Sequence, residues 1–348
     1  MNRRSVPAVG LAALLVVAGC GSDDDETSAA SASTTSTAVV APSTTVVAPT
    51  TEAPTTTTTP DPRAARPYTF TTTQLTFVDD SRSTPESPGG PEIDTRTLDT
   101  WLYLPDTDEP APLVIFSHGM AGHPNKFEDL HTAWAEAGYA VAAPAFPLSN
   151  DTAQGSFGNV HDVPNQDDDV SFLLDQLLAQ NDDASSELAG RFDADRVATG
   201  GLSAGGATTY EAAVNDLDRD PRFRAAIVMA GARFTSPDNG TFEAPTDQPV
   251  YLLHGDADPL VPYAGAQETY ALLGAPKFFT TLLGGGHAGP FEDTDDGFEP
   301  KAPGTDELVH PATIAFLDHY VLGLPEAVDE LLVAAEQPDL ANFVYETG

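Results

Sequence analysis

The chain has 348 residues, of which 41% are hydrophobic, so it is long enough for one large or two ordinary domains with a sizeable core. Its 15 lysines and arginines stand against 53 aspartates and glutamates, which gives a formal net charge of −38. Such a surface repels phosphate groups, which excludes nucleic-acid binding and charge-driven docking on an anionic membrane. The single cysteine excludes an internal disulfide and a metal site with several thiolate ligands.

The N-terminal segment carries the pattern of an export signal. Two arginines precede an apolar run over residues 8–18, which is too short to span a membrane comfortably. The run ends in Val17-Ala18-Gly19-Cys20, which resembles the lipobox of bacterial lipoproteins. The resemblance implies a signal peptide over residues 1–19 and a lipid on Cys20 that anchors the exported protein to the outer face of a bacterial membrane. An ordinary secretory signal with an incidental cysteine is the alternative.

The composition changes after this signal. Residues 20–66 are dominated by Ser, Thr, Ala and Pro, and they contain the run Thr55–Thr59. Such a segment has too little apolar content to offset the loss of chain entropy on folding, so we expect a disordered tether. The remaining residues, 67–348, are then a single folded domain held away from the lipid.

From Tyr68 onward, strand-like and helix-like segments alternate along the chain. The predicted strands are Leu75–Val78, Thr97–Leu104, Leu113–Ser117, Tyr139–Ala143, Arg196–Thr199, Ala225–Ala230, Val250–His254 and Lys277–Leu282. The predicted helices are Lys126–Ala137, Asp167–Gln180, Ala204–Asn215, Tyr263–Leu273 and Leu308–Leu322. Several of the strands are continuous apolar runs, which is typical of a parallel sheet covered on both faces. The order predicts an α/β fold with a doubly wound, mostly parallel sheet, helices on both faces and a leading antiparallel edge.

The segment Gly201-Leu202-Ser203-Ala204-Gly205 has the pattern G-x-S-x-G. Small residues around Ser203 allow a sharp turn that exposes its hydroxyl at the start of a helix. A glycine-rich turn with an idle serine is the alternative, but the predicted strand before it and helix after it favour a nucleophile.

Two further elements have the residue types of a proton relay. Asp256 and Asp258 follow the buried strand that ends at His254, and either carboxylate could orient an imidazole and stabilise its cation. His287 follows three glycines after the last predicted strand, and of the eight histidines it is the one that completes the chain order Ser, Asp, His. The residues alone leave the choice between the two aspartates open.

Together with the buried strand that ends in His118-Gly119, these elements resemble an α/β-hydrolase of the serine esterase and lipase type over most of residues 68–322. The segments Thr76–Pro85 and Arg96–Leu98, and the pair Asn165-Gln166, are similar to those of the platelet-activating-factor acetylhydrolase, chlorophyllase and dienelactone-hydrolase-like group. The resemblance therefore implies an α/β-hydrolase fold and an enzyme that needs no metal and no organic cofactor.

The resemblance also implies a role for each site residue. The pattern H-G-x-x-D-x-x-V-P assigns the acid to Asp258 and leaves Asp256 as a turn residue. Ser203 is then the nucleophile and His287 the base, and the backbone N–H groups of Met120 and Ala204 stabilise the oxyanion.

The expected function is hydrolysis of carboxylic esters through an acyl-enzyme. Only 19 residues, 231–249, separate two predicted strands where a large lid commonly lies in this fold, so we expect an open site for short-chain or lipid-derived acyl esters or for a polymer end. Phe146, Phe234 and Phe291 are candidates to line the pocket or simply to pack in the core. Two alternatives remain: a catalytically idle surface lipoprotein that binds a ligand, and a serine peptidase or acyltransferase with the same triad.

Overall fold

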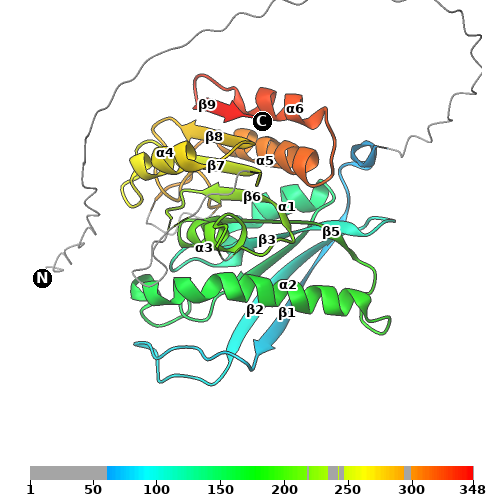
Figure 1. The fold of residues 1–348 in the computed structure, drawn as a ribbon, viewed down its shortest axis with the longest axis vertical. Coiled ribbons are helices and arrows are strands. Elements are labelled where there is room, and N and C mark those ends of the chain that lie inside the picture. The colour runs from blue at the N-terminus through cyan, green and yellow to red at the C-terminus, as the bar shows by residue number, and fades with distance from the viewer. Residues whose placement is uncertain (1–60, 218, 234–241, 243–246, 294–298, 348) are drawn as a thin grey trace, which may run out of the picture. The chain divides into compact units, whose positions relative to one another are not determined.

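The computed structural model describes residues 61–217, 219–233, 242, 247–293 and 299–347 (Figure 1). The strands are β1 (Phe70–Asp79), β2 (Arg96–Pro105), β3 (Ala111–Ser117), β4 (Ala140–Ala145), β5 (Phe192–Leu202), β6 (Phe223–Met229), β7 (Val250–Gly255), β8 (Lys277–Leu282) and β9 (Ala341–Glu346). The α-helices are α1 (Glu128–Glu136), α2 (Gln166–Asp182), α3 (Ala204–Ala213), α4 (Tyr263–Leu272), α5 (Asp306–Tyr320) and α6 (Ala327–Ala335). Short 3-10 helices are η1 (Pro62–Ala65), η2 (Pro124–Phe127), η3 (Ser156–Gly158) and η4 (Val160–Asn165).

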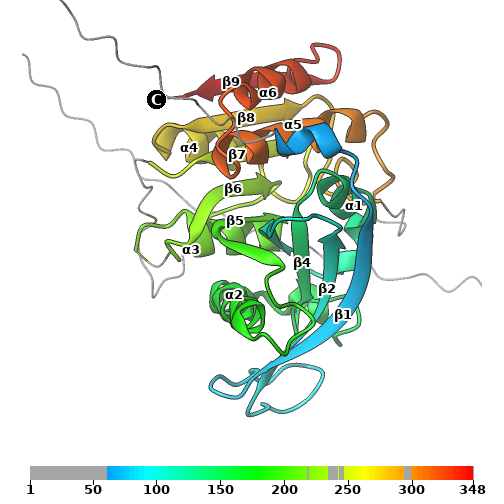
Figure 2. The same cartoon turned by 90° about the vertical axis from the view of Figure 1, so that its right-hand side faces the viewer.

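Within these residues the strands form one sheet in the order β1-β2-β4-β3-β5-β6-β7-β8-β9. The strands from β4 to β8 in this order are parallel, whereas β2 pairs antiparallel with both β1 and β4, and β9 pairs antiparallel with β8. Helices α2, α3 and α4 cover one face, and α1 and α5 cover the other (Figure 2). The predicted fold class, including the leading antiparallel edge, is therefore confirmed.

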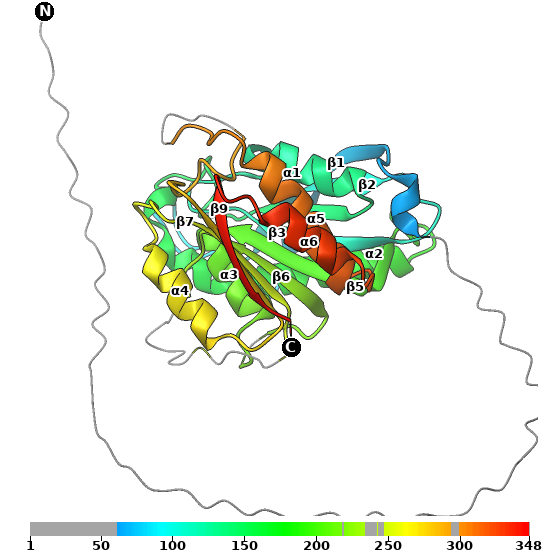
Figure 3. The ribbon, with the colours of Figure 1, turned by 90° about the horizontal axis from the view of Figure 1, so that it is seen from above.

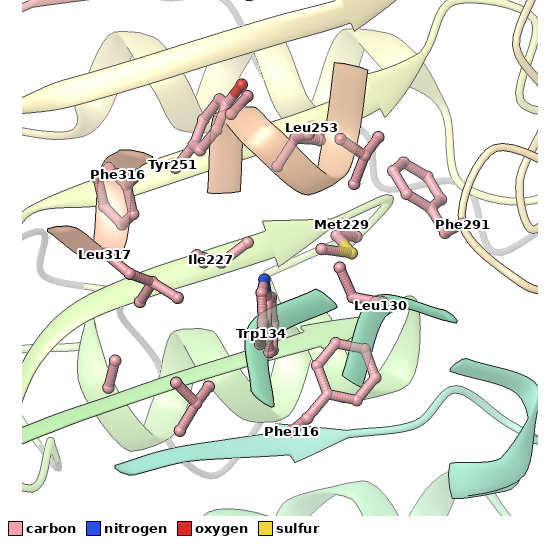
Figure 4. Close-up of a cluster of buried hydrophobic side chains, with 14 of the residues drawn as sticks. Phe116, Leu130, Trp134, Ile227, Met229, Tyr251, Leu253, Phe291, Phe316 and Leu317 are labelled. Atoms are coloured by element: carbon pink, nitrogen blue, oxygen red, sulfur yellow. The ribbon is translucent and has the colours of Figure 1, made fainter. Parts of the chain in front are cut away.

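Each face of the sheet carries its own hydrophobic core. On one face, α1 and α5 pack Trp134 and Phe316 against strand residues such as Phe116 and Tyr251, all of them buried (Figure 4). On the other, α2 buries the apolar stripe that begins at Val170. Because both faces are covered, β3, β4, β7 and β8 are buried along their whole length, which explains the mostly apolar sequences of β3, β4 and β7.

The folded domain begins before the predicted boundary at residue 66. In η1, Arg63 forms ion pairs of 2.6 Å with both Glu326 and Glu330 near and on α6. Arg66 donates two hydrogen bonds of 2.6 Å to the buried carboxylate of Asp318 on α5, which also accepts from the Tyr139 hydroxyl. Figure 3 shows η1 and α6 on the same side of the sheet. Residues 61–66 are thus packed on the domain that they were expected to tether.

Two C-terminal elements, α6 and β9, were not predicted, and β1 and β5 begin several residues earlier than expected. None of the helices in the described ranges has the length and apolar character needed to cross a bilayer.

Candidate active site

The predicted catalytic and oxyanion-hole residues lie at the carboxyl ends of the parallel strands. Ser203 follows β5, Asp258 follows β7, His287 follows β8 and Met120 follows β3. Since the carboxyl ends of parallel strands point the same way, residues separated by more than 160 positions come to one place.

Ser203 occupies a tight turn between β5 and α3. Its backbone has φ 58° and ψ −114°, a conformation that side-chain-bearing residues seldom adopt, and its N–H donates to the Met229 carbonyl at 2.9 Å. A Cβ atom added at Gly201 would lie 2.4 Å from the Gly205 carbonyl oxygen, and one at Gly205 would lie 2.0 Å from that of Ser117. The glycines of the G-x-S-x-G pattern therefore permit close backbone contact, which leaves the Ser203 hydroxyl at the N-terminus of α3.

The three side chains named by the sequence form a continuous hydrogen-bonded row. The Ser203 Oγ lies 2.8 Å from His287 Nε2, and His287 Nδ1 lies 2.7 Å from Asp258 Oδ2. Because a carboxylate accepts only, Nδ1 carries the proton and Nε2 is left to accept from the serine hydroxyl. This geometry can remove a proton from the serine while the carboxylate compensates the charge on the ring.

The side chain of Asp258 is completely buried, and each of its oxygens has two polar partners. Oδ1 accepts from the backbone N–H groups of Leu260 and Val261 at 2.8 and 2.9 Å. Oδ2 faces His254 Nε2 at 3.1 Å as well as His287. Burial raises the pKa of Asp258, but the hydrogen bonds from His254, His287 and the Val261 N–H and the electrostatic interaction with His287 together lower it by more, so this pKa is well below the ordinary value. The carboxyl group is therefore ionised at neutral pH.

The structure separates the two aspartates that the residues alone left open. The exposed Asp256 does not reach an imidazole: its Oδ1 accepts from the Gly284 N–H at 2.7 Å and ties the turn after β7 to the loop after β8. His254 also lies beside Asp258, which was not predicted. Its position four residues before Asp258, at the end of a buried strand, was the available signal.

The loop after β3 lies directly beside Ser203, since a Cβ added at Gly119 would be 3.1 Å from the Ser203 Cβ. The buried His118 accepts from the Phe146 N–H through Nε2 at 3.1 Å, so its Nδ1 carries the proton and donates to the Gly119 carbonyl at 2.7 Å. Burial lowers the pKa of His118 to about 4, which keeps this arrangement at neutral pH. A fixed Gly119 carbonyl also fixes the N–H of Met120 in the same peptide plane.

Neither the Met120 N–H nor the Ala204 N–H donates to another group among the residues that the structure describes. The Ala204 N–H is the first of α3, where helix geometry leaves it without an intrahelical acceptor. Two adjacent unused donors beside a serine hydroxyl are what a developing oxyanion requires.

Two of the three aromatic residues that were candidates either to line the pocket or to pack in the core are core residues. Phe146 and Phe291 are buried in the two hydrophobic cores, Phe146 against the His118 ring and Phe291 in the cluster of Figure 4. Phe234, and most of the segment 231–249 on which the open-cleft expectation rests, lie outside the described residues. Over the described part of the chain, no group of three or more His, Cys, Asp or Glu side chains is arranged to hold a metal ion.

The sheet order and the turn at Ser203 define an α/β-hydrolase. Residues 98–302 match the model of the dienelactone hydrolase family, and the chain therefore belongs to that family, which supports an ester hydrolase. Among solved structures, the chain is similar to a ferulic acid esterase from Streptomyces cinnamoneus with a TM-score of 0.59 and 22% identity, over 79% of this chain and 94% of that one. At this identity the likeness concerns the fold. No curated protein sequence matches the chain.

Proposed function

We propose that this protein is a serine esterase that cleaves carboxylic esters through an acyl-enzyme, with Ser203, His287 and Asp258 as its catalytic residues. The observation that carries the proposal is the row of hydrogen bonds from Ser203 Oγ to His287 and on to the buried, ionised Asp258. Membership of the dienelactone hydrolase family supports the reaction class.

In the proposed reaction, Ser203 Oγ attacks the ester carbonyl carbon while its proton passes to His287 Nε2. The N–H groups of Met120 and Ala204 stabilise the negative charge on the former carbonyl oxygen, an effect worth about 2.7–4 kcal/mol for one such donor. His287 then gives the proton to the departing alkoxide, which leaves as an alcohol. Water, deprotonated by His287, attacks the acyl-serine and releases the acid and the free Ser203 hydroxyl.

Labelling with a fluorophosphonate probe tests the nucleophile. We expect the full chain to be labelled and to hydrolyse p-nitrophenyl acetate, and we expect Ser203→Ala to abolish both properties. Ser185→Ala, on an exposed turn, is the matched control and keeps both. A folded protein that is neither labelled nor active would favour the idle binding protein instead.

For the substrate we propose short acyl esters. A comparison of p-nitrophenyl acetate, p-nitrophenyl butyrate, a long-chain ester and a peptide amide measures this preference through kcat/KM. A clear preference for the amide would overturn the esterase proposal in favour of a peptidase with the same triad. Transfer of the acyl group to an added alcohol in preference to water would favour an acyltransferase.

We further propose that the protein is exported and anchored to the outer face of a bacterial membrane through a lipid on Cys20. The support is the sequence around this sole cysteine, which lies outside the described residues. Cys20→Ala is expected to move the protein from the membrane fraction to the soluble fraction without loss of esterase activity. Equal membrane association of the two forms would refute the anchor.

A further inference from the structure

The loop that carries His287 is held by a carboxylate from a later part of the chain. Glu299 Oε2 accepts two backbone hydrogen bonds of 2.8 Å, one from the N–H of His287 and one from the N–H of Ala288. Two consecutive N–H groups that converge on one oxygen form a concave anion-binding arrangement of the backbone. Here the anion is a side chain of the protein itself.

The glycines of this loop leave the space that the Glu299 carboxylate occupies. A Cβ atom added at Gly286 would lie 1.6 Å from Glu299 Oε1, and the three nearest atoms to it all belong to Glu299. A Cβ at Gly289 would lie 2.4 Å from the Pro300 carbonyl oxygen and 3.1 Å from Glu299 Oε1. Neither glycine has a positive φ, so backbone conformation does not demand glycine at these two positions. The Glu299 carboxylate explains why residue 286 must be a glycine, since it fills the space that a side chain would need.

The other side of the loop is fixed by backbone contacts with the turn after β7. The Gly285 carbonyl accepts from the Ala257 N–H at 3.0 Å, and a Cβ at Gly255 would lie 2.2 Å from that carbonyl oxygen. The loop is therefore held between the turn that carries Asp258 on one side and Glu299 on the other. Both sets of contacts hold the backbone next to His287, whose imidazole must stay between Asp258 and Ser203.

We propose that Glu299 is a positioning residue of the esterase: its carboxylate fixes the backbone at His287 and so holds the imidazole in line with Ser203 and Asp258. This inference rests on the proposed function of the Ser203 site. A run of glycines has a large conformational freedom to lose, and two charge-assisted hydrogen bonds offset that loss locally. A ring displaced by about 1 Å can cost about a hundredfold in rate.

The first test removes or preserves the acceptor. Glu299→Ala is expected to lower kcat for p-nitrophenyl acetate by about a hundredfold with little change in KM, since the substrate contacts are intact. Glu299→Gln retains an oxygen that can accept both N–H groups and is expected to recover most of the rate. Glu187→Ala removes a carboxylate from an exposed surface position and is expected to leave kcat unchanged. The rate of fluorophosphonate labelling at Ser203 should follow kcat.

The second test uses the space at Gly286. In the native background, Gly286→Ala places a methyl group on the Glu299 carboxylate and is expected to lower kcat about as much as Glu299→Ala does. In the Glu299→Ala background, the same substitution meets no carboxylate and is expected to cost little further. The two substitutions are thus strongly non-additive, which a general loss of stability at two independent positions would not produce.

An active wild-type enzyme whose kcat is unchanged by Glu299→Ala overturns this proposal and leaves the proposed function intact. Additive losses from Glu299→Ala and Gly286→Ala overturn it as well. A wild-type protein without labelling or esterase activity instead refutes the proposed function. Thermal unfolding of each variant identifies any that fail to fold, and the Glu299→Gln comparison keeps the test decisive in that event.

Discussion

His131 on α1 is a buried imidazole that lies among aromatic side chains. Its ring packs against the aromatic side chains of Phe116, Phe127 and Tyr103, and it has no measurable exposure. Among the described residues, neither Nδ1 nor Nε2 is within hydrogen-bond distance of a polar atom. Burial lowers the pKa of His131 to about 3, so the ring is neutral in the folded protein at every pH near neutrality.

The linkage between protonation and folding gives the sign and size of the effect. In the unfolded chain the ordinary pKa of histidine is about 6.5, so below this pH the unfolded state binds a proton that the folded state rejects. The stability associated with His131 is therefore complete above pH 6.5 and is lost as the pH falls toward 3. At pH 5, about 1.5 pH units below the unfolded value, the loss is about 2 kcal/mol at about 1.4 kcal/mol per unit.

We test this with His131→Leu, which replaces the imidazole by an apolar side chain of similar volume. Between pH 7.5 and pH 5.0, the free energy of unfolding of the wild type is expected to fall by about 2 kcal/mol more than that of His131→Leu. Chemical denaturation at the two pH values measures the difference. The control is Val333→Leu, at an exposed apolar position, which removes no titratable group and should leave the pH dependence of the free energy of unfolding unchanged. The reasoning is refuted if wild type and His131→Leu lose the same stability.

Three other substitutions probe the site and the domain boundary. Gly205→Ala adds a Cβ that would lie 2.0 Å from a backbone oxygen, and it is expected to abolish fluorophosphonate labelling or to prevent folding; normal labelling would contradict the tight turn. His118→Ala is expected to lower kcat/KM about a hundredfold to a thousandfold, as loss of one oxyanion donor does, and equal rates would show that Met120 is positioned otherwise. Arg66→Ala leaves Asp318 buried without its cation and is expected to cost about 3–5 kcal/mol in denaturant unfolding. A smaller loss than that of an exposed substitution would refute this contact.

The strands of the sheet could be predicted where burial on both faces requires an apolar sequence. Strands β3, β4 and β7 are buried throughout and appear in the sequence as apolar runs. In contrast, of the residues of β9 only Ala341 is buried, because this strand lies at the edge of the sheet and pairs with β8 alone. The backbone of β9 pairs with β8, about sixty residues earlier in the chain, and no pattern within residues 341–346 predicts this pairing.

In the active site, too, some features depend on the local sequence and others on contacts with distant parts of the chain. The turn at Ser203 is largely a local structure, since a Cβ at Gly201 would meet the backbone of Gly205 four residues later, and a five-residue pattern suffices to predict it. The contact of Gly205 with the Ser117 carbonyl, in contrast, comes from a distant strand. Asp256 and Asp258 lie in one turn, so their local patterns are alike; the direction in which each side chain points separates them, and that depends on the loop after β8.

The role of Glu299 is still harder to predict from the local sequence, because it depends on the contact between Glu299 and the loop that carries His287. The chain nevertheless carries a trace of this contact at Gly286, a glycine with an ordinary φ and no room for a methyl group. Where a glycine has an ordinary φ and yet no room for a Cβ atom, another atom occupies the place of its side chain, and the identity of that atom can bear on function. At Gly286 that atom is a carboxylate oxygen of Glu299. Gly286 directly precedes His287, whose imidazole must accept the serine proton.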